Sequence, residues 1–157
     1  MARDMGASKA HVFGAVPPAS KRGYDYQHFV CNWHYYVPES NLIEEWSFEG
    51  VDFDGLHPTE CHLYEAKHGY DGFLEDDWAE GVPKLRKWAV LSARHIFDDM
   101  RDQARRQSVV VKPHYPDVKL TWVFSSMVTK LYVFNIFLNS RMVPPIDDEV
   151  RPFERGS

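Results

Sequence analysis

The sequence predicts an α/β protein in which helices pack on a mixed β-sheet. Three observations support this prediction: a helical pattern that begins at Tyr24, strand-like patterns between residues 42 and 67, and two later helical patterns on either side of a third strand. The predicted order of elements is α-β-β-α-β-α. The chain has 157 residues, of which 44% are hydrophobic and 26% charged, and this composition is typical of one folded domain.

The first half of the chain predicts one helix followed by a hairpin. From Tyr24 to residue 37, aromatic and aliphatic residues recur at i, i+3 and i+4, and Pro38 is expected to end this helix. Residues 42–56 are expected to be extended. With a buried strand at residues 61–67, they are predicted to form an antiparallel hairpin.

The second half of the chain predicts a long helix, a strand and a final helix. A helix is expected near residues 78–107, where an amphipathic stripe follows two aspartates that can cap its first turn. Residues 120–124 are predicted to form a strand. The final helix is expected to cover residues 128–138.

Both ends of the chain lack this periodicity. Residues 1–22 contain few large apolar side chains and are predicted to be a linker or N-terminal arm. After residue 143 the pattern is lost again, so residues 144–157 are predicted to be a C-terminal tail. We therefore expect the folded domain to occupy residues 23–143.

Charge is distributed unevenly along this chain, which has a net charge of −5. Residues 44–80 contain twelve acidic residues and one basic residue, whereas residues 84–112 contain eight basic and three acidic residues. Two solvated faces would give this distribution, and so would a divalent metal site beside a phosphate-binding surface. The two cysteines exclude a disulfide scaffold, and no apolar run approaches 18 residues, so we expect no membrane partner.

Asp54, Glu65 and Lys67 have the clearest catalytic potential. Alternate side chains of a strand share a face, so Glu65 and Lys67 point the same way, and pairing of the hairpin brings Asp54 near Glu65. Two carboxylates and a backbone carbonyl such as that of Ala66 suit Mg²⁺. A lysine beside them can orient or deprotonate the water that attacks a phosphate. An acidic strand with a chance ion pair is the alternative interpretation.

The wider pattern resembles the PD-(D/E)xK nuclease superfamily and, more narrowly, the restriction-endonuclease-fold toxin 5 family (Tox-REase-5) of bacterial polymorphic toxins. The resemblance is carried by these stretches: Glu45-Trp46, Phe53-Asp54-Gly55, Tyr64-Glu65-Ala66-Lys67 with Tyr70 following, Gln103 to Gln107, and Leu120 to Ser125 with Trp122. Together they span residues 24–126. The resemblance implies a restriction-endonuclease-like αβββαβ sandwich with a central mixed sheet.

The resemblance also implies the roles of individual residues. Asp54 and Glu65 would ligate the metal, which would be Mg²⁺ or another divalent cation such as Mn²⁺, and Lys67 would be the catalytic lysine. Many members of the superfamily place a glutamate on the first helix, where this sequence has none. Gln27 is the candidate for that position.

The predicted long helix carries further candidates. Gln103 and Gln107 lie one helical turn apart and would contact phosphate or the water shell of the metal, although two solvated glutamines would fit the same pattern. Arg101, Arg105 and Arg106 are predicted to contact the phosphates of DNA.

The function implied by the resemblance is that of an antibacterial, metal-dependent DNase. Such domains are often delivered as type VI secretion effectors behind a PAAR or Rhs region, act in the cytoplasm of the target cell, and are neutralised by a cognate immunity protein. We therefore expect DNA, an immunity protein and the secretion apparatus as partners. The alternative is a non-catalytic module that keeps the nuclease fold and binds a partner protein. The acidic net charge favours this alternative, whereas the intact set of Asp54, Glu65 and Lys67 favours the enzyme.

Overall fold

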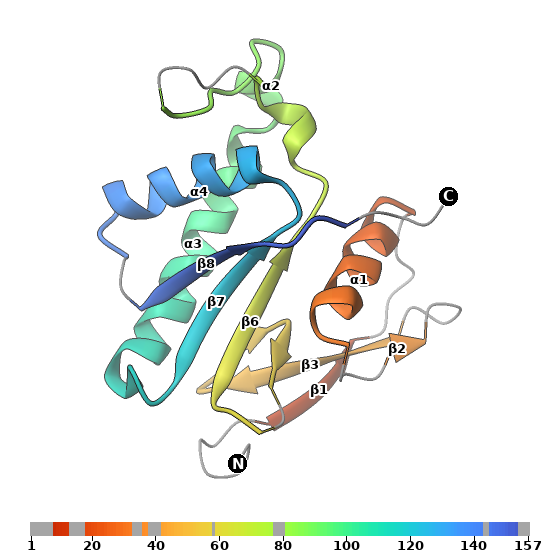
Figure 1. Cartoon of the computed structure of the whole chain (residues 1–157), viewed down its shortest axis with the longest axis vertical. Coiled ribbons are helices and arrows are strands. Elements are labelled where there is room, and N and C mark those ends of the chain that lie inside the picture. Colours follow the sequence, from red (N-terminus) through yellow and green to blue (C-terminus); the bar gives the residue numbers. More distant parts are fainter. Residues whose placement is uncertain are drawn as a thin grey trace.

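The structure is a computed structural model that describes most of the chain (Figure 1). The described residues are 8–12, 18–32, 36–37, 42–57, 59–76, 81–142 and 145–153. Their elements are, in order, β1 (Ser8–Val12), α1 (Pro18–Val30), β2 (Tyr36–Val37), β3 (Leu42–Phe48), β4 (Val51–Phe53), β5 (Gly55–Leu56), β6 (His62–Lys67), the 3-10 helix η2 (Asp71–Phe73), α2 (Ala89–Ser92), α3 (Arg94–Val111), the 3-10 helix η3 (Lys112–His114), β7 (Lys119–Phe124), α4 (Met127–Asn139) and β8 (Ile146–Val150).

The first of two four-stranded sheets is antiparallel and is built around β3. Strand β1 pairs along one edge of β3, while β2 and β4 pair with the two ends of its other edge. The tight turn between β3 and β4 contains Gly50, whose φ of 80° favours a residue without a side chain. This hairpin ends at Phe53, which places Asp54 at the junction between the two sheets.

The second sheet, in the order β5-β6-β7-β8, is the mixed sheet that the sequence predicts. Strands β5 and β6 form the expected antiparallel pair, with Gly55 opposite Tyr64, while β6, β7 and β8 are parallel. Parallel strands need crossover connections, which α3 supplies between β6 and β7 and α4 supplies between β7 and β8. The fold is therefore an α/β sandwich around a mixed sheet, as the sequence predicts.

Helices cover both faces of the second sheet, as Figure 1 shows. On one face the main core packs residues of α3 and α4, such as Met100 and Phe137, against Trp122 of β7. On the other face Tyr26 of α1 packs in a smaller cluster around Val123. Because side chains alternate along a strand, β6 presents its odd-numbered residues to α3 and its even-numbered residues to α1.

The predictions for both ends of the chain need correction. Strand β1 and the first turns of α1 lie within residues 1–22, which we expected to be an arm, and β8 lies within the predicted tail. The sequence of β8 alternates poorly because three acidic residues follow Ile146, although Ile146 itself is buried. Both strands are stabilised by partners far away in the sequence, so their local composition does not reveal them.

Two helix boundaries were also predicted wrongly. The first helix ends at Val30 rather than at residue 37, because residues 36–37 pair with β3 as strand β2. The long helix begins at Arg94 rather than near residue 78, and its first predicted residues lie outside the described part of the chain. Before it, Leu85 forms a bridge with Leu74, and this pairing replaces the expected helical turns.

The final helix and the strand before it agree with the sequence prediction. Residues 119–124 form β7, and α4 covers Met127–Asn139. Among helices of the described residues, none combines the length with the apolarity that a membrane crossing requires.

Candidate active site

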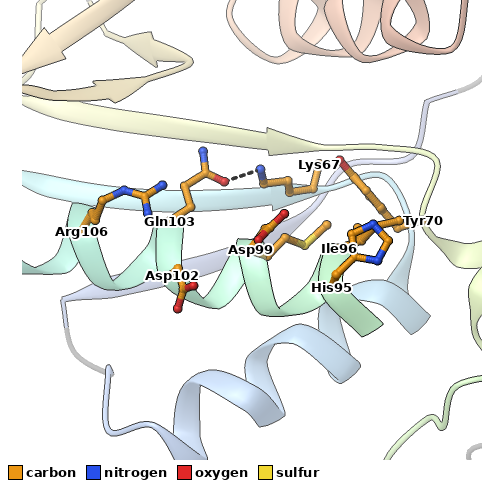
Figure 2. A pocket seen from close by; sticks show the side chains of 9 residues that line it. Lys67, Tyr70, His95, Ile96, Asp99, Asp102, Gln103 and Arg106 are labelled. Atoms are coloured by element: carbon orange, nitrogen blue, oxygen red, sulfur yellow. Dashed lines mark hydrogen bonds between the residues drawn. The ribbon is translucent and has the colours of Figure 1, made fainter. Parts of the chain in front are cut away.

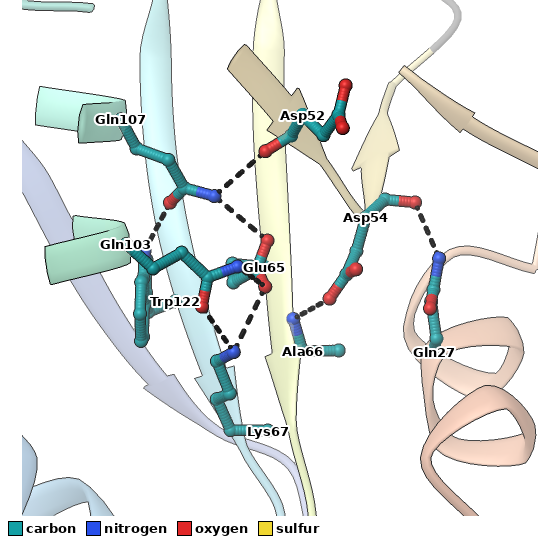
Figure 3. Close-up of polar contacts among 9 residues, drawn as sticks. All are labelled: Gln27, Asp52, Asp54, Glu65, Ala66, Lys67, Gln103, Gln107 and Trp122. Atoms are coloured by element: carbon teal, nitrogen blue, oxygen red, sulfur yellow. Dashed lines mark hydrogen bonds and ion pairs between the residues drawn. The ribbon is translucent and has the colours of Figure 1, made fainter. Parts of the chain in front are cut away.

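The candidate residues meet where β6 passes between α3 and the start of β5 (Figure 3). Glu65 and Lys67 are two positions apart on β6 and both face α3. Asp54 comes from the junction before β5, and its Oδ2 atom accepts a hydrogen bond of 2.7 Å from the backbone N–H of Ala66. The antiparallel pairing of β5 with β6 therefore brings the two carboxylates together, as the hairpin predicted.

Glu65 is held by hydrogen bonds at both oxygens of its carboxylate, which is only 3% exposed. Its Oε1 atom accepts a bond of 3.0 Å from Nε2 of Gln107. Its Oε2 atom accepts a bond of 2.7 Å from Nε2 of Gln103 and lies 3.1 Å from Nζ of Lys67. A buried carboxylate needs such partners, and here three side chains supply them.

The two glutamines also bind donors through their carbonyl oxygens. Oε1 of Gln103 accepts a bond of 2.7 Å from Nζ of Lys67, and Oε1 of Gln107 accepts a bond of 2.9 Å from Nε1 of Trp122. Nε2 of Gln107 also donates to the backbone oxygen of Asp52 at 3.2 Å. The alternative of two solvated glutamines is therefore wrong, since Gln107 is fully buried and both amides are oriented by the network.

Lys67 is an ammonium group in a crowded, polar environment. Its side chain is 10% exposed, and Nζ lies 4.9 Å from the centre of a Trp122 ring. Burial lowers the pKa of Lys67, but the carboxylates of Glu65 and Asp54 outweigh burial, so the pKa lies above its ordinary value. Lys67 is thus positively charged at neutral pH and is suited to interact with an anion.

The carboxylates near α1 are less well compensated. Burial and the repulsion from Glu65 raise the pKa of Asp54 well above its ordinary value, against the opposing effect of Lys67. Within the described residues, Oδ1 of Asp54 accepts no hydrogen bond. Burial and the same repulsion raise the pKa of Glu45, on β3, to about 7, although a hydrogen bond from Gln27 opposes this shift.

Glu45 is a site residue that sequence reasoning missed as a functional group. It lines the same cleft as Asp54 and Glu65 and supplies a carboxylate from β3 instead of from the first helix. Gln27 does reach the site, where its Nε2 atom donates to the backbone oxygen of Asp54 at 3.1 Å. The sequence feature that could have indicated Glu45 is its place inside a predicted strand, in the pair of acidic residues between Ile43 and Trp46.

A cleft of about 740 Å³ connects these carboxylates with the surface. Its lining includes Tyr24, Gln27, Glu45, Asp54, Lys67 and Phe73. A second pocket of about 500 Å³ on the α3 side shares Lys67 and Tyr70 with the cleft (Figure 2). A third, of about 280 Å³, shares Gln103 and Arg106 with the second. The three pockets therefore follow one another along α3, with Lys67 between the first two.

The three arginines predicted to contact DNA lie in different surroundings. Arg106 is exposed and lines both pockets beside Gln103. Arg101 instead pairs with Asp98 at 3.6 Å and with Asp102 at 3.7 Å. Arg105 is exposed but lines none of these three pockets. The structure thus brings Arg106 to the candidate site and leaves the other two arginines outside it.

The donor groups of the site fit a hard divalent cation. Within the described residues, no three Asp, Glu, His or Cys side chains lie close enough to hold a metal ion by themselves. Asp54 and Glu65 nevertheless offer carboxylate oxygens beside the backbone of Ala66, and Mg²⁺ commonly uses one or two carboxylates and keeps several waters. Positive charge there would also offset the repulsion that raises the pKa of Asp54.

The mixed sheet, with Glu65 and Lys67 on β6 and Asp54 just before β5, defines a protein of the restriction-endonuclease fold. The family model for restriction endonuclease fold toxin 5 (Tox-REase-5) matches residues 23–127, and the chain belongs to this family. The matched segment includes every residue of the site described above. No curated protein matches the sequence. Membership in this family makes the chain a toxin domain with a nuclease fold.

Proposed function

We propose that the domain hydrolyses phosphodiester bonds of DNA with a divalent metal, Mg²⁺ or Mn²⁺, and acts as an antibacterial toxin. One observation carries this proposal: Asp54, Glu65 and Lys67 converge at the base of a cleft in a protein of a nuclease-fold toxin family. Keeping two carboxylates and a lysine together in a partly buried site is costly for stability, and catalysis is a function that requires such an arrangement.

Asp54 and Glu65 are the residues that would hold the metal. A bound divalent ion would polarise the phosphate and lower the pKa of a water molecule. In hydrolysis a water oxygen forms a bond to phosphorus while the bond to the leaving oxygen breaks, and negative charge develops on the phosphoryl oxygens.

Lys67 is placed to stabilise that developing charge. Its ammonium is already oriented by Oε1 of Gln103 and by the Glu65 carboxylate, so it needs little reorganisation when the substrate arrives. Gln103 and Gln107 are positioning residues, since their amides fix the Glu65 carboxylate. Gln103 also orients the ammonium of Lys67. Arg106 lies farther along α3, where it can bind a neighbouring phosphate.

The biological setting extends this proposal. The domain would be the C-terminal part of a type VI secretion effector, carried by a PAAR or Rhs-type region into the cytoplasm of a target bacterium. A cognate immunity protein would neutralise it in the producing cell. Family membership supports the toxin activity, while the route and the inhibitor follow from the resemblance to secreted polymorphic toxins.

Cleavage of supercoiled plasmid DNA tests the enzymatic proposal. The wild-type chain is expected to nick and linearise the plasmid with Mg²⁺ or Mn²⁺ and to leave it intact in EDTA. Cleavage in EDTA would contradict the metal requirement. No cleavage with any divalent ion would instead favour the non-catalytic module. Expression in the bacterial cytoplasm should arrest growth, and co-expression of a small neighbouring coding sequence should restore it.

A further inference from the structure

An apolar tip lies on and just before α2, at the top of Figure 1. We define this tip by four exposed residues: Val82, Trp88, Val90 and Leu91. Trp88 is 63% exposed and Leu91 is 93% exposed. Large apolar side chains exposed along one segment of the surface are typical of a binding site, because a partner that covers them removes apolar area from water.

The tip is firmly attached to the domain. Ala89 and Ala93, on either side of Leu91, are completely buried. Just before α2, the backbone N–H of Arg86 donates to the carbonyl oxygen of Phe73 at 2.9 Å. The exposure of Trp88 and Leu91 is therefore a feature of an anchored segment and not of a frayed end.

The tip borders the catalytic cleft. The centroid of a Trp88 ring lies 5.9 Å from that of Phe73, and Phe73 lines the cleft together with Asp54 and Lys67. Tyr70 lines the cleft as well. Aromatic side chains thus extend from the candidate active site to Trp88 at the surface.

Exposed lysines lie beside the tip. Residues 81–93 contain three basic residues and no acidic residue, while the segment paired with them adds Glu75 and Asp76. Lys84 and Lys87 are exposed, whereas Arg86 pairs with Asp76 at 3.7 Å. A ligand that matches a flat aromatic ring and two nearby ammonium groups has apolar faces and negative charge, which is the chemistry of a single-stranded nucleic acid.

The depth of the site also favours an unpaired strand. Glu65 is 3% exposed, and the Lys67 side chain is 10% exposed. A phosphate must therefore approach the base of the cleft closely, and a single strand can bend into it more easily than a rigid duplex.

We propose that Trp88 and Leu91 form a stacking platform for unpaired bases of a DNA strand whose backbone continues into the cleft. This inference rests on the proposed DNase function and specifies its substrate class: single-stranded DNA, or the single-stranded part of a partly opened duplex. Trp88 stacks on one base and Leu91 contacts the face of the next base. Lys84 and Lys87 bind the adjacent phosphates.

Fluorescence anisotropy with a labelled 20-nucleotide DNA in EDTA tests the platform without cleavage. Trp88→Ala should weaken single-strand binding about 5- to 100-fold, which corresponds to the loss of one stacked base, while duplex binding changes less than about twofold. Trp88→Phe should restore affinity to within about threefold because it keeps an aromatic face. Leu138→Ser is the matched control for Leu91→Ser: Leu138 is 63% exposed on α4, so its replacement should have no effect.

Several results would overturn the platform. Among them are unchanged single-strand affinity in Trp88→Ala, an equal loss for single-stranded and duplex DNA, and absence of single-strand binding by the wild-type chain. If Trp88→Ala does not fold, Trp88→Phe and Leu91→Ser still test the platform. Leu91→Ser must then weaken single-strand binding more than Leu138→Ser does. Plasmid cleavage by the wild type separates the two proposals. Plasmid cleavage with unchanged affinity in Trp88→Ala overturns only the platform, whereas no cleavage of either plasmid or single-stranded DNA overturns the DNase itself.

Discussion

The two sides of the candidate active site differ in how well their charges are compensated. On the α3 side (Glu65, Lys67, Gln103 and Gln107), each carboxylate oxygen of Glu65 has a hydrogen-bond donor. On the open side (Asp54 and Glu45), burial and repulsion from Glu65 raise the pKa of both carboxyl groups. One side is thus pre-organised by the fold, while the other side is stabilised by added positive charge. A site with this asymmetry is prepared to receive a cation.

Asp54→Asn should lower the rate of DNA cleavage but raise the stability of the metal-free protein, and it should have the largest effect of these changes. If Asp54 holds the metal, plasmid cleavage should fall about 100- to 1,000-fold, the usual size of an effect from losing one group that stabilises the transition state. The metal-free variant should nevertheless be more stable than the wild type at neutral pH, because it removes a repelled carboxylate and keeps an acceptor for the Ala66 N–H. Urea unfolding in EDTA and a cleavage assay with Mg²⁺ measure the two effects. A loss of stability would contradict the proposed charge imbalance.

Gln107→Leu should show that the hydrogen bonds on the α3 side stabilise the fold as well as the catalytic residues. The variant leaves the Trp122 N–H and Oε1 of Glu65 without a partner in a fully buried position. The free energy of unfolding should fall by about 2–4 kcal/mol, measured by urea denaturation. Gln103→Leu serves as the comparison. Gln103 is only half-buried, so water can replace part of what is lost and the cost should be smaller. Equal costs for the two variants would contradict this account.

Glu45 should make the stability of the metal-free protein depend on pH. Its pKa rises from 4.5 to about 7 on folding, so the folded state binds more protons than the unfolded state between these values. Stability from this group is therefore complete below about pH 4.5 and is lost as the pH rises toward 7, by about 1–3 kcal/mol. Glu45→Gln should flatten the pH profile of thermal unfolding in this window. A profile as steep as that of the wild type would assign the pH dependence to other groups.

Magnesium, held by Asp54 and Glu65, should have the smallest effect. At a concentration ten times its dissociation constant, Mg²⁺ should stabilise the folded protein by about 1.4 kcal/mol, because it binds only the assembled site. For a domain of this size the melting temperature would rise by about 3–5 °C. The double variant Asp54→Asn, Glu65→Gln should not respond to Mg²⁺. A response that survives both changes would place the ion elsewhere.

Sequence reasoning was most successful where the relevant contacts are local. The strand period places Glu65 and Lys67 on one face, and the neighbouring hairpin brings Asp54 to them, so this part of the site was predicted from the sequence. The helical period likewise placed Gln103 and Gln107 together, although it left open whether they are buried.

The remaining features depend on contacts between distant segments. Glu45 reaches the site only because β3 and β4 carry it to the junction between the two sheets. Strands β1 and β8 pair with β3 and β7, respectively; β1 is only five residues long, and β8 has three acidic residues after Ile146. Burial and pairing of this kind are properties of the tertiary structure, so no local pattern could predict them.

The most direct test of the proposed active site compares Lys67→Met with Lys112→Met in the plasmid cleavage assay with Mg²⁺. Methionine keeps an unbranched side chain but removes the ammonium, and Lys112 is an exposed lysine of η3 that lines none of the three pockets. Cleavage by Lys67→Met should fall at least about 100-fold, while its near-ultraviolet circular dichroism stays that of the wild type. Lys112→Met should cleave at the wild-type rate. A folded Lys67→Met protein that cleaves DNA as fast as the wild type would contradict the account.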